Sequence, residues 1–218
     1  KVELPTNSNL QTIESRVFGE TKIEEISIPA SVTKIGENAF CRCKNLAKIE
    51  IPTNSNLKVI ENEAFSGSNI EEISFPEGLI ELEEEWCNDI HSLAKIIISP
   101  SNGQFVFKDD KYLLGKSDSK SDEFDILLFA RRDIEDISIP SNVKIIKPFS
   151  FQFSVLKEIL IPSSVTKICE NAFSGCRSLK KVSIPTNSNL KTIGKKSFSY
   201  LNIEEISIPA SVTEICED

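Results

Sequence analysis

The sequence has few of the residues on which enzyme active sites depend. His91 is the one histidine among 218 residues, and no Gly-x-Ser-x-Gly segment occurs that would place a nucleophilic serine on a tight turn. Gly115-Lys116-Ser117 is similar to the end of a phosphate-binding loop, but Asp110 stands where that loop requires its first glycine. We therefore expect no enzyme activity, no cofactor and no small-molecule substrate.

Metal-ligand residues are equally sparse. Cys87, Asp89 and His91 are close in sequence and could begin a metal site, but zinc requires four ligands and no second cluster exists. The favoured interpretation is a partly exposed loop histidine, so we predict no metal. A metal or ligand bound near His91 would be the observation that favours an enzyme.

Long apolar runs and clustered positive charge are also missing. The chain is 39% hydrophobic and 27% charged, and no run is long enough to cross a bilayer. It has no basic-plus-apolar start that is typical of a signal peptide. A net charge of -8 argues against a nucleic-acid partner, because phosphate binding needs clustered Lys and Arg.

Repetition is what the sequence has in abundance. The segment IEEISIPASVT stands at residues 23–33 and again, letter for letter, at 203–213. Ile26 and Ile28 alternate with polar residues, which predicts a strand with one buried face. A proline then ends the strand, and such prolines recur about every 23 residues, a period typical of stacked repeats. They are Pro5, Pro29, Pro52, Pro76, Pro100, Pro140, Pro162, Pro185 and Pro209.

Two further positions recur in most repeats. An aromatic residue fills one: Phe18, Phe40, Phe65, Trp86, Phe151, Phe173 and Phe198. A small residue after the strand fills the other, and its side chain can satisfy backbone groups where the chain turns: Asn9, Ser31, Asn56, Gly78, Asn142, Ser164, Asn189 and Ser211. Gly78 cannot do so, and we expect its turn to be less regular. One repeat cannot bury its apolar positions alone, so the pattern predicts a stacked coil.

The repeat at 162–185 reads P-x-S-V-T-x-I-x-x-x-A-F-x-x-C-x-x-L-x-x-V-x-I-P. This pattern resembles the BspA-like leucine-rich repeats of bacterial and trichomonad surface proteins. The Pro-Thr-Asn-Ser-Asn-Leu loops at 5–10, 52–57 and 185–190 resemble the protist members most. The resemblance implies a right-handed solenoid with a parallel β-sheet on the concave face, and loops and short helical turns on the convex face. It also implies a cell-surface or extracellular binding and adhesion protein with a protein or glycan ligand, such as a host-cell surface. The alternative is an intracellular scaffold with the same coil.

We predict one leucine-rich repeat domain over residues 1–218, with an inserted β-hairpin at about 101–133. Apolar runs at 105–116 and 124–130 flank the polar segment Ser117–Glu123, which is the expected linker of that hairpin. The chain begins and ends in mid-repeat, so we expect it to be part of a longer protein. Any membrane attachment is then expected outside this stretch, and the chain is expected to be a monomer.

The six cysteines do not form an evident disulfide framework. Cys43 and Cys176 occupy the same position in their repeats. Cys169 and Cys216 are two repeats apart, about twice the ~4.8 Å strand spacing and beyond the reach of a disulfide. We predict free thiols.

Charged residues are expected to alternate from one repeat to the next. Acidic pairs such as Glu24-Glu25 and Glu71-Glu72 alternate with Lys48 and Lys95, so opposite charges become neighbours in a parallel, in-register stack. The favoured interpretation is a solvated charge ladder, and the alternative is an electrostatic docking stripe.

One exposed strand position predicts where a partner binds. Most repeats place Glu or Ser between the two buried strand residues, but two place an apolar residue, Ile97 and Leu160, on either side of the insertion. The hairpin could instead fold back and cover Ile97. We predict a partner-binding face that comprises Lys95, Ile97, Tyr112, Asp136, Glu158, Leu160 and Lys181.

Overall fold

The computed structural model describes residues 2–5 and 7–217; Lys1, Thr6 and Asp218 lie outside the described residues. The chain divides into two compact units, Lys1–Asp110 and Lys111–Asp218, which are described separately. The division falls within the predicted insertion. A single domain over 1–218 stays a prediction.

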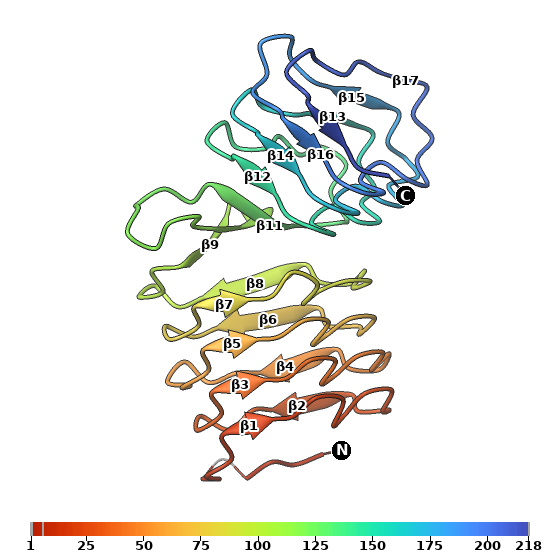
Figure 1. The fold of residues 1–218 in the computed structure, drawn as a ribbon. Coiled ribbons are helices and arrows are strands. Elements are labelled where there is room, and N and C mark those ends of the chain that lie inside the picture. The colour runs from red at the N-terminus through yellow and green to blue at the C-terminus, as the bar shows by residue number, and fades with distance from the viewer. Residues whose placement is uncertain (1, 6, 218) are drawn as a thin grey trace. The chain divides into compact units, whose positions relative to one another are not determined.

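The first unit is a stack of coils in which each repeat contributes one strand to each of two parallel sheets (Figure 1). The Ile-x-Ile-Pro segments form one sheet, with β2 (Glu25–Ser27), β4 (Lys48–Glu50), β6 (Glu72–Phe75) and β8 (Lys95–Ile98). The two-residue strands later in each repeat form the other sheet, with β1 (Thr12–Ile13), β3 (Lys34–Ile35), β5 (Val59–Ile60) and β7 (Glu81–Leu82). A further strand, β9 (Phe105–Lys108), follows β8.

The second unit repeats this plan. One parallel sheet comprises β13 (Glu158–Leu160), β15 (Lys181–Ser183) and β17 (Glu205–Ile206). The other contains β12 (Ile145–Ile146), β14 (Lys167–Ile168), β16 (Thr192–Ile193) and β18 (Glu214–Ile215). At its edge, β11 (Ile126–Ala130) pairs in parallel with β12 and antiparallel with β10 (Tyr112–Gly115).

The predicted parallel, in-register stack is confirmed. Ile26 lies opposite Ile49, and Ile159 opposite Val182, and all four side chains are buried in the core. The expectation of a single sheet was incomplete because the two-residue strands of successive repeats pair as well and form a second sheet. Thr33, for example, donates its N–H to the Gln11 carbonyl, and its own carbonyl accepts the N–H of Lys58.

The predicted inserted hairpin is confirmed as β10 and β11, with Ser117–Glu123 in the connection between them. The apolar run at 105–116 differs from expectation because it forms two strands. It is interrupted at Asp109 and Asp110, whose φ angles of 55° and 52° are left-handed. Since β11 pairs in parallel with β12, the second strand of the hairpin takes the place of an ordinary coil strand.

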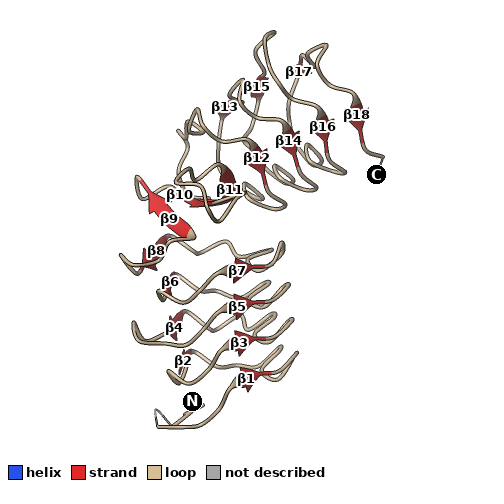
Figure 2. Ribbon diagram, turned by 60° about the vertical axis from the view of Figure 1, so that its left-hand side comes forward, coloured by secondary structure: helices blue, strands red, loops and turns tan. Residues whose placement is uncertain are grey.

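The short helical turns expected on the convex face are not formed, and this expectation is corrected: the described residues contain strands and turns but no helix (Figure 2). In the turn around residues 38–41, successive N–H groups form hydrogen bonds in two different directions. Those of Ala39 and Cys41 bond three residues back within the turn, whereas those of Asn38 and Phe40 bond carbonyls of the next coil. Asn38 and Arg42 are also left-handed, with φ angles of 56° and 55°. A continuous α-helix would need every N–H to bond within its own segment.

The core of each unit is built on stacked phenylalanine rings. In the first unit Phe18, Phe40 and Phe65 stack with centroid distances of 5.3 and 5.6 Å. In the second unit three rings at equivalent repeat positions stack at 4.8 and 5.5 Å: Phe151, Phe173 and Phe198. The repeated aromatic position is therefore a ring stack that continues from coil to coil.

All six cysteines are free thiols in the structure, as predicted. Cys43 and Cys176 are fully buried, and each Sγ donates to a carbonyl of the preceding coil, those of Phe18 and Phe151, at 2.9 Å. Burial raises the pKa of the Cys176 thiol to about 12. Such a thiol stays protonated and serves as a buried hydrogen-bond donor.

Candidate binding site

The strand face of the second unit brings together most of the residues predicted to contact a partner. On β13, β15 and β17, Glu158, Lys181 and Glu205 lie opposite one another in register, so opposite charges alternate across the sheet. Leu160 lies opposite Ser183 and is 57% exposed. Leu160 is the one large apolar side chain of these three strands that is strongly exposed, and it lies on a face that is otherwise polar and charged.

Two shallow hollows lie along this face. The first has a volume of about 330 Å³ and is lined by Asp136, Ser138, Glu158, Leu160 and Ser183, among others. The second, of about 570 Å³, lies over β15 and is lined by Lys180, Lys181, Glu204, Glu205 and Ser207, among others. The structure thus groups four of the predicted residues, Asp136, Glu158, Leu160 and Lys181, on one face of one unit.

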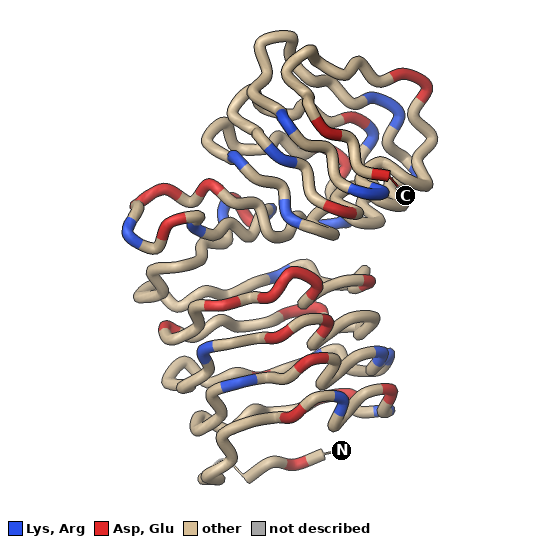
Figure 3. The backbone as a smooth tube through the Cα atoms, in the orientation of Figure 1, with Lys and Arg blue, Asp and Glu red and all other residues tan. Residues whose placement is uncertain are grey.

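Lys95 and Ile97 belong to the first unit and are described with it. Both lie on β8, where the Lys95 ammonium is 2.7 Å from Glu72 and Ile97 is 42% exposed opposite Ser74. Figure 3 shows acidic segments on successive coils of this unit. A hollow of about 760 Å³ extends over β2, β4 and β6, and its lining includes Ser27, Lys48, Glu50, Glu71 and Glu72.

Tyr112 does not belong to the exposed face, and its predicted role as a partner contact is corrected. The side chain is 3% exposed, and its hydroxyl donates to the carbonyl of Ser138 at 2.5 Å. Leu113, Leu127 and Phe129 of the hairpin are also fully buried. These residues of the hairpin therefore form core, and Tyr112 holds the backbone of Ser138, a residue that lines the 330 Å³ hollow.

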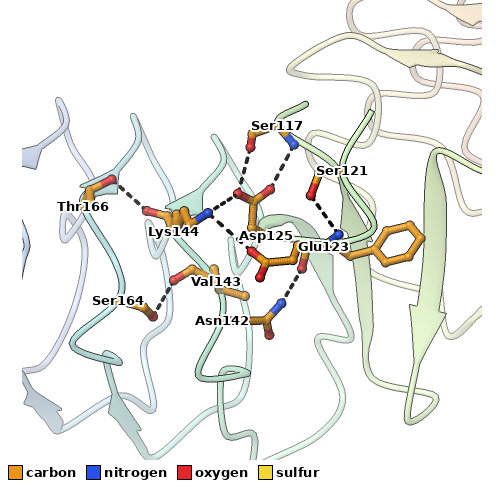
Figure 4. Close-up of polar contacts among 10 residues, drawn as sticks. Ser117, Ser121, Glu123, Asp125, Asn142, Val143, Lys144, Ser164 and Thr166 are labelled. Carbon is orange, nitrogen blue, oxygen red and sulfur yellow. Dashed lines mark hydrogen bonds and ion pairs between the residues drawn. The ribbon is translucent and has the colours of Figure 1, made fainter. Parts of the chain in front are cut away.

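A buried carboxylate, not anticipated from the sequence, holds the connection of the hairpin in place (Figure 4). The Asp125 side chain is 3% exposed; it accepts bonds from the Ser117 N–H at 2.9 Å and hydroxyl at 2.7 Å, and its Oδ2 is 3.0 Å from the Lys144 ammonium. Burial alone would raise the pKa of Asp125, but the bonds from Ser117 and Lys144 outweigh it and hold the pKa below its ordinary value. The sequence signal was the acidic residue beside the apolar run 126–130, in a position that most other repeats fill with Thr or Lys.

Asn102, two residues after Pro100, also fills the small polar position of its repeat, which was not predicted from the sequence. It is buried, and its amide donates to the carbonyls of Pro76 and Leu79 at 2.8 and 2.9 Å. Ser31 does the same for Ser8 and Leu10 in its preceding coil. The polar position thus joins consecutive coils, as its chemistry predicted, and counting two residues from Pro100 would have found Asn102.

Little in the structure points to catalytic chemistry. His91 is exposed and its Nε2 is 3.1 Å from Asp89, whereas Cys87 is buried. Among the described residues, no three or more His, Cys, Asp or Glu side chains are placed to hold a metal ion. Residues 2–5 and 7–217 also contain no helix long and apolar enough to cross a membrane.

These features define a class of protein: a leucine-rich repeat solenoid with exposed strand faces. The sequence profile of the BspA-type leucine-rich repeat region matches residues 1–113 and 123–218 in six copies. The chain therefore belongs to the BspA-type leucine-rich repeat family. No curated protein sequence matches it.

Solved structures of bacterial proteins have the same fold. The pneumococcal vaccine antigen PcpA is 28% identical, with a TM-score of 0.87 over 95% of this chain and 50% of the antigen. A leucine-rich cell surface protein from Faecalibacterium prausnitzii is 23% identical, with a TM-score of 0.82 over 94% of this chain and 53% of that protein. This chain spans about half the length of both.

Proposed function

We propose that this chain is a non-catalytic binding module of a surface protein, which attaches to a protein or glycan partner. The observation that carries the proposal is the strand face of the second unit, where exposed Leu160 lies among alternating charges. Leu160 lines the 330 Å³ hollow together with Asp136 and Glu158, and an apolar centre with a polar rim is the usual composition of a protein interface. Exposed ion pairs add little affinity, but they select a partner of matching charge.

Location at the cell surface is part of this proposal. It is supported by the family, by the F. prausnitzii protein described as a cell surface protein, and by PcpA described as a vaccine antigen. On the same grounds we propose an adhesive role, with a host-cell surface as the partner.

A second candidate is an intracellular scaffold with the same coil. It is favoured by the six free thiols, because proteins of oxidising compartments more often pair their cysteines. Both candidates use the strand faces for binding and differ in compartment.

The test begins with partners recovered from cell and glycan preparations on the immobilised chain, identified, and then measured one at a time. We expect Leu160→Ser and the double variant Glu158→Ala/Lys181→Ala to weaken binding. Tyr200→Ser is the matched control, because Tyr200 is 75% exposed but lies in a turn outside the strands. A purified partner that binds all of these folded variants equally would show that the site lies elsewhere.

The connection of the hairpin needs a careful variant. Replacing all of Ser117–Glu123 would remove both bonds from Ser117 to Asp125 and disturb the fold. Replacing only residues 118–122 with Gly and Ser keeps that contact and tests whether the connection contributes to partner binding.

A further inference from the structure

The coil that follows Pro100 departs from the repeat directly after its small polar position. Every other repeat has Leu or Val there, and most of these side chains are fully buried: Val32, Leu57, Leu79, Val143, Val165 and Leu190. In this coil Gly103 follows Asn102, and the two form the single Asn-Gly pair in the sequence. The coil thus lacks an apolar side chain at a position that the other repeats use for the core.

Neither the backbone nor the packing requires glycine at position 103. Its φ angle is not left-handed, and a Cβ atom added there would meet no atom of the described residues within 4 Å. Gly103 is also exposed to solvent. The fold therefore does not account for this glycine, whereas the chemistry of the asparagine before it is strongly affected by it.

Asparagine followed by glycine loses its side-chain amide readily, because glycine has no side chain to hinder attack by its own backbone nitrogen. The Gly103 nitrogen gives its proton to solvent and attacks Cγ of Asn102. The new N–Cγ bond replaces the Cγ–Nδ2 bond, and Nδ2 takes up a proton and leaves as ammonia. Water then opens the cyclic imide at either of its carbonyls and yields aspartate or isoaspartate, with no change in oxidation state.

The folded coil holds the Asn102 amide away from this reaction. Asn102 is 8% exposed, and its Nδ2 donates to the carbonyls of Pro76 and Leu79 at 2.8 and 2.9 Å. Its Oδ1 accepts the N–H groups of Gln104 and Phe105, both at 2.9 Å. The nitrogen that must leave is therefore held between two carbonyls of the preceding coil, where water does not reach it.

The product of the reaction cannot restore these contacts. An ionised aspartate only accepts hydrogen bonds, so at position 102 it would face the carbonyls of Pro76 and Leu79 without donating to them. Burial of a carboxylate without a partner is unfavourable. Isoaspartate adds a carbon to the main chain and displaces the segment further. A coil that has reacted is therefore held less firmly by the coil before it.

We propose that Asn102-Gly103 is a deamidation site gated by the opening of its own coil. The closed coil protects the amide, an opened coil loses it, and the loss keeps the coil from closing again. Packed proteins open locally without unfolding as a whole, so the modified fraction records how often this coil opens. This inference goes beyond the proposed binding function and does not depend on it.

The first test compares the whole chain with a synthetic peptide of residues 98–107 at neutral pH and physiological temperature. Mass spectrometry of proteolytic fragments follows residue 102 over time, and chromatography separates aspartate from isoaspartate. We expect the peptide to deamidate at least about tenfold faster than the folded chain. Equal rates would overturn the gating, and a peptide that keeps its amide would overturn the site.

Two deletions of buried rings locate the gate. The Phe75 ring lies in the preceding coil, 6.2 Å from that of Phe105, so Phe75→Ala loosens the packing around Asn102 without changing its sequence neighbours. We expect deamidation to become about threefold to tenfold faster, and less than about twofold faster in Phe173→Ala, which deletes a buried ring of the second unit. Equal acceleration would show that the reaction passes through unfolding of the whole chain and would contradict a local gate.

Two substitutions at the pair itself test the reaction and its product. Since a Cβ atom fits at position 103, Gly103→Ala should fold normally and slow the loss of the amide. Asn102→Asp should reduce amide protection in hydrogen exchange at residues 76–79 and 99–105, whereas Asn54→Asp in an exposed loop should not. Undiminished deamidation in Gly103→Ala would refute the role of the glycine. Full protection in Asn102→Asp would refute the claim that the product keeps the coil open.

Discussion

Truncation of one buried ring tests how the coils stabilise one another. Phe65 is fully buried, and its ring stacks on that of Phe40 at 5.6 Å. Replacing it with alanine removes the ring and leaves a cavity that the short turns around it cannot fill. We expect the free energy of unfolding to fall by about 3–5 kcal/mol, the usual cost of deleting a buried aromatic side chain.

The position of each ring in the stack gives an expected order. Phe40 has a stacked ring on both sides, Phe65 has one, and Phe18 has one but is only half-buried. Stacked aromatic pairs contribute about 0.5–1.5 kcal/mol beyond their burial. Phe40→Ala should therefore cost the most and Phe18→Ala the least.

Urea unfolding measures these losses, and hydrogen exchange locates them. Because each coil contacts only its neighbours, Phe65→Ala should reduce amide protection mainly over residues 46–90. Unchanged protection there, or a cost for Phe18→Ala equal to that for Phe65→Ala, would refute the ring-stack reasoning.

Three further predictions concern other parts of the chain. Asp125→Asn should lower the free energy of unfolding by about 1–3 kcal/mol at neutral pH. Because the pKa of Asp125 is lower in the folded chain, its carboxylate stabilises the fold above about pH 4, and this stabilisation is lost as the pH falls through the folded pKa. The free energies of unfolding of the two proteins should therefore converge in acid. A difference in stability that persists in acid would show that the Asp125 carboxylate is not its source. Asn102→Ala leaves two buried carbonyls without their donor and should cost about 1–3 kcal/mol in urea unfolding, against little change for Asn54→Ala in an exposed loop. Intact-mass analysis after alkylation in denaturant, without reductant, should count six alkylated cysteines, and any protected pair would contradict the free thiols.

Much of the fold could be predicted from the sequence because a repeat restates the same constraint many times. One alternating segment such as 23–33 is weak evidence for a fold on its own. Its return every 23 residues or so fixes the parallel register, and the register in turn places Glu25 beside Lys48. The ring stack follows for the same reason, since one aromatic position per coil must superpose on the next.

The site was predictable only where it follows the repeat. The exposure of Ile97 and Leu160 came from their place in the alternation, and the structure agrees. Tyr112 lies in the insertion, where no repeat constrains it, and it proved to be buried. Apolar residues outside a periodic pattern do not reveal which side of a strand faces the core.

The sequence by itself determined which residues stack and in which order, because the repeat period fixes every neighbour in a solenoid. Only the tertiary structure decided how the turns are built and how the insertion is held. The turns use left-handed residues and bonds between coils, and the Asp125 contact joins Ser117 to Lys144 across the connection. Both depend on groups brought together by the stacking itself, and no local pattern in the chain encodes a partner that arrives only when the next coil is in place.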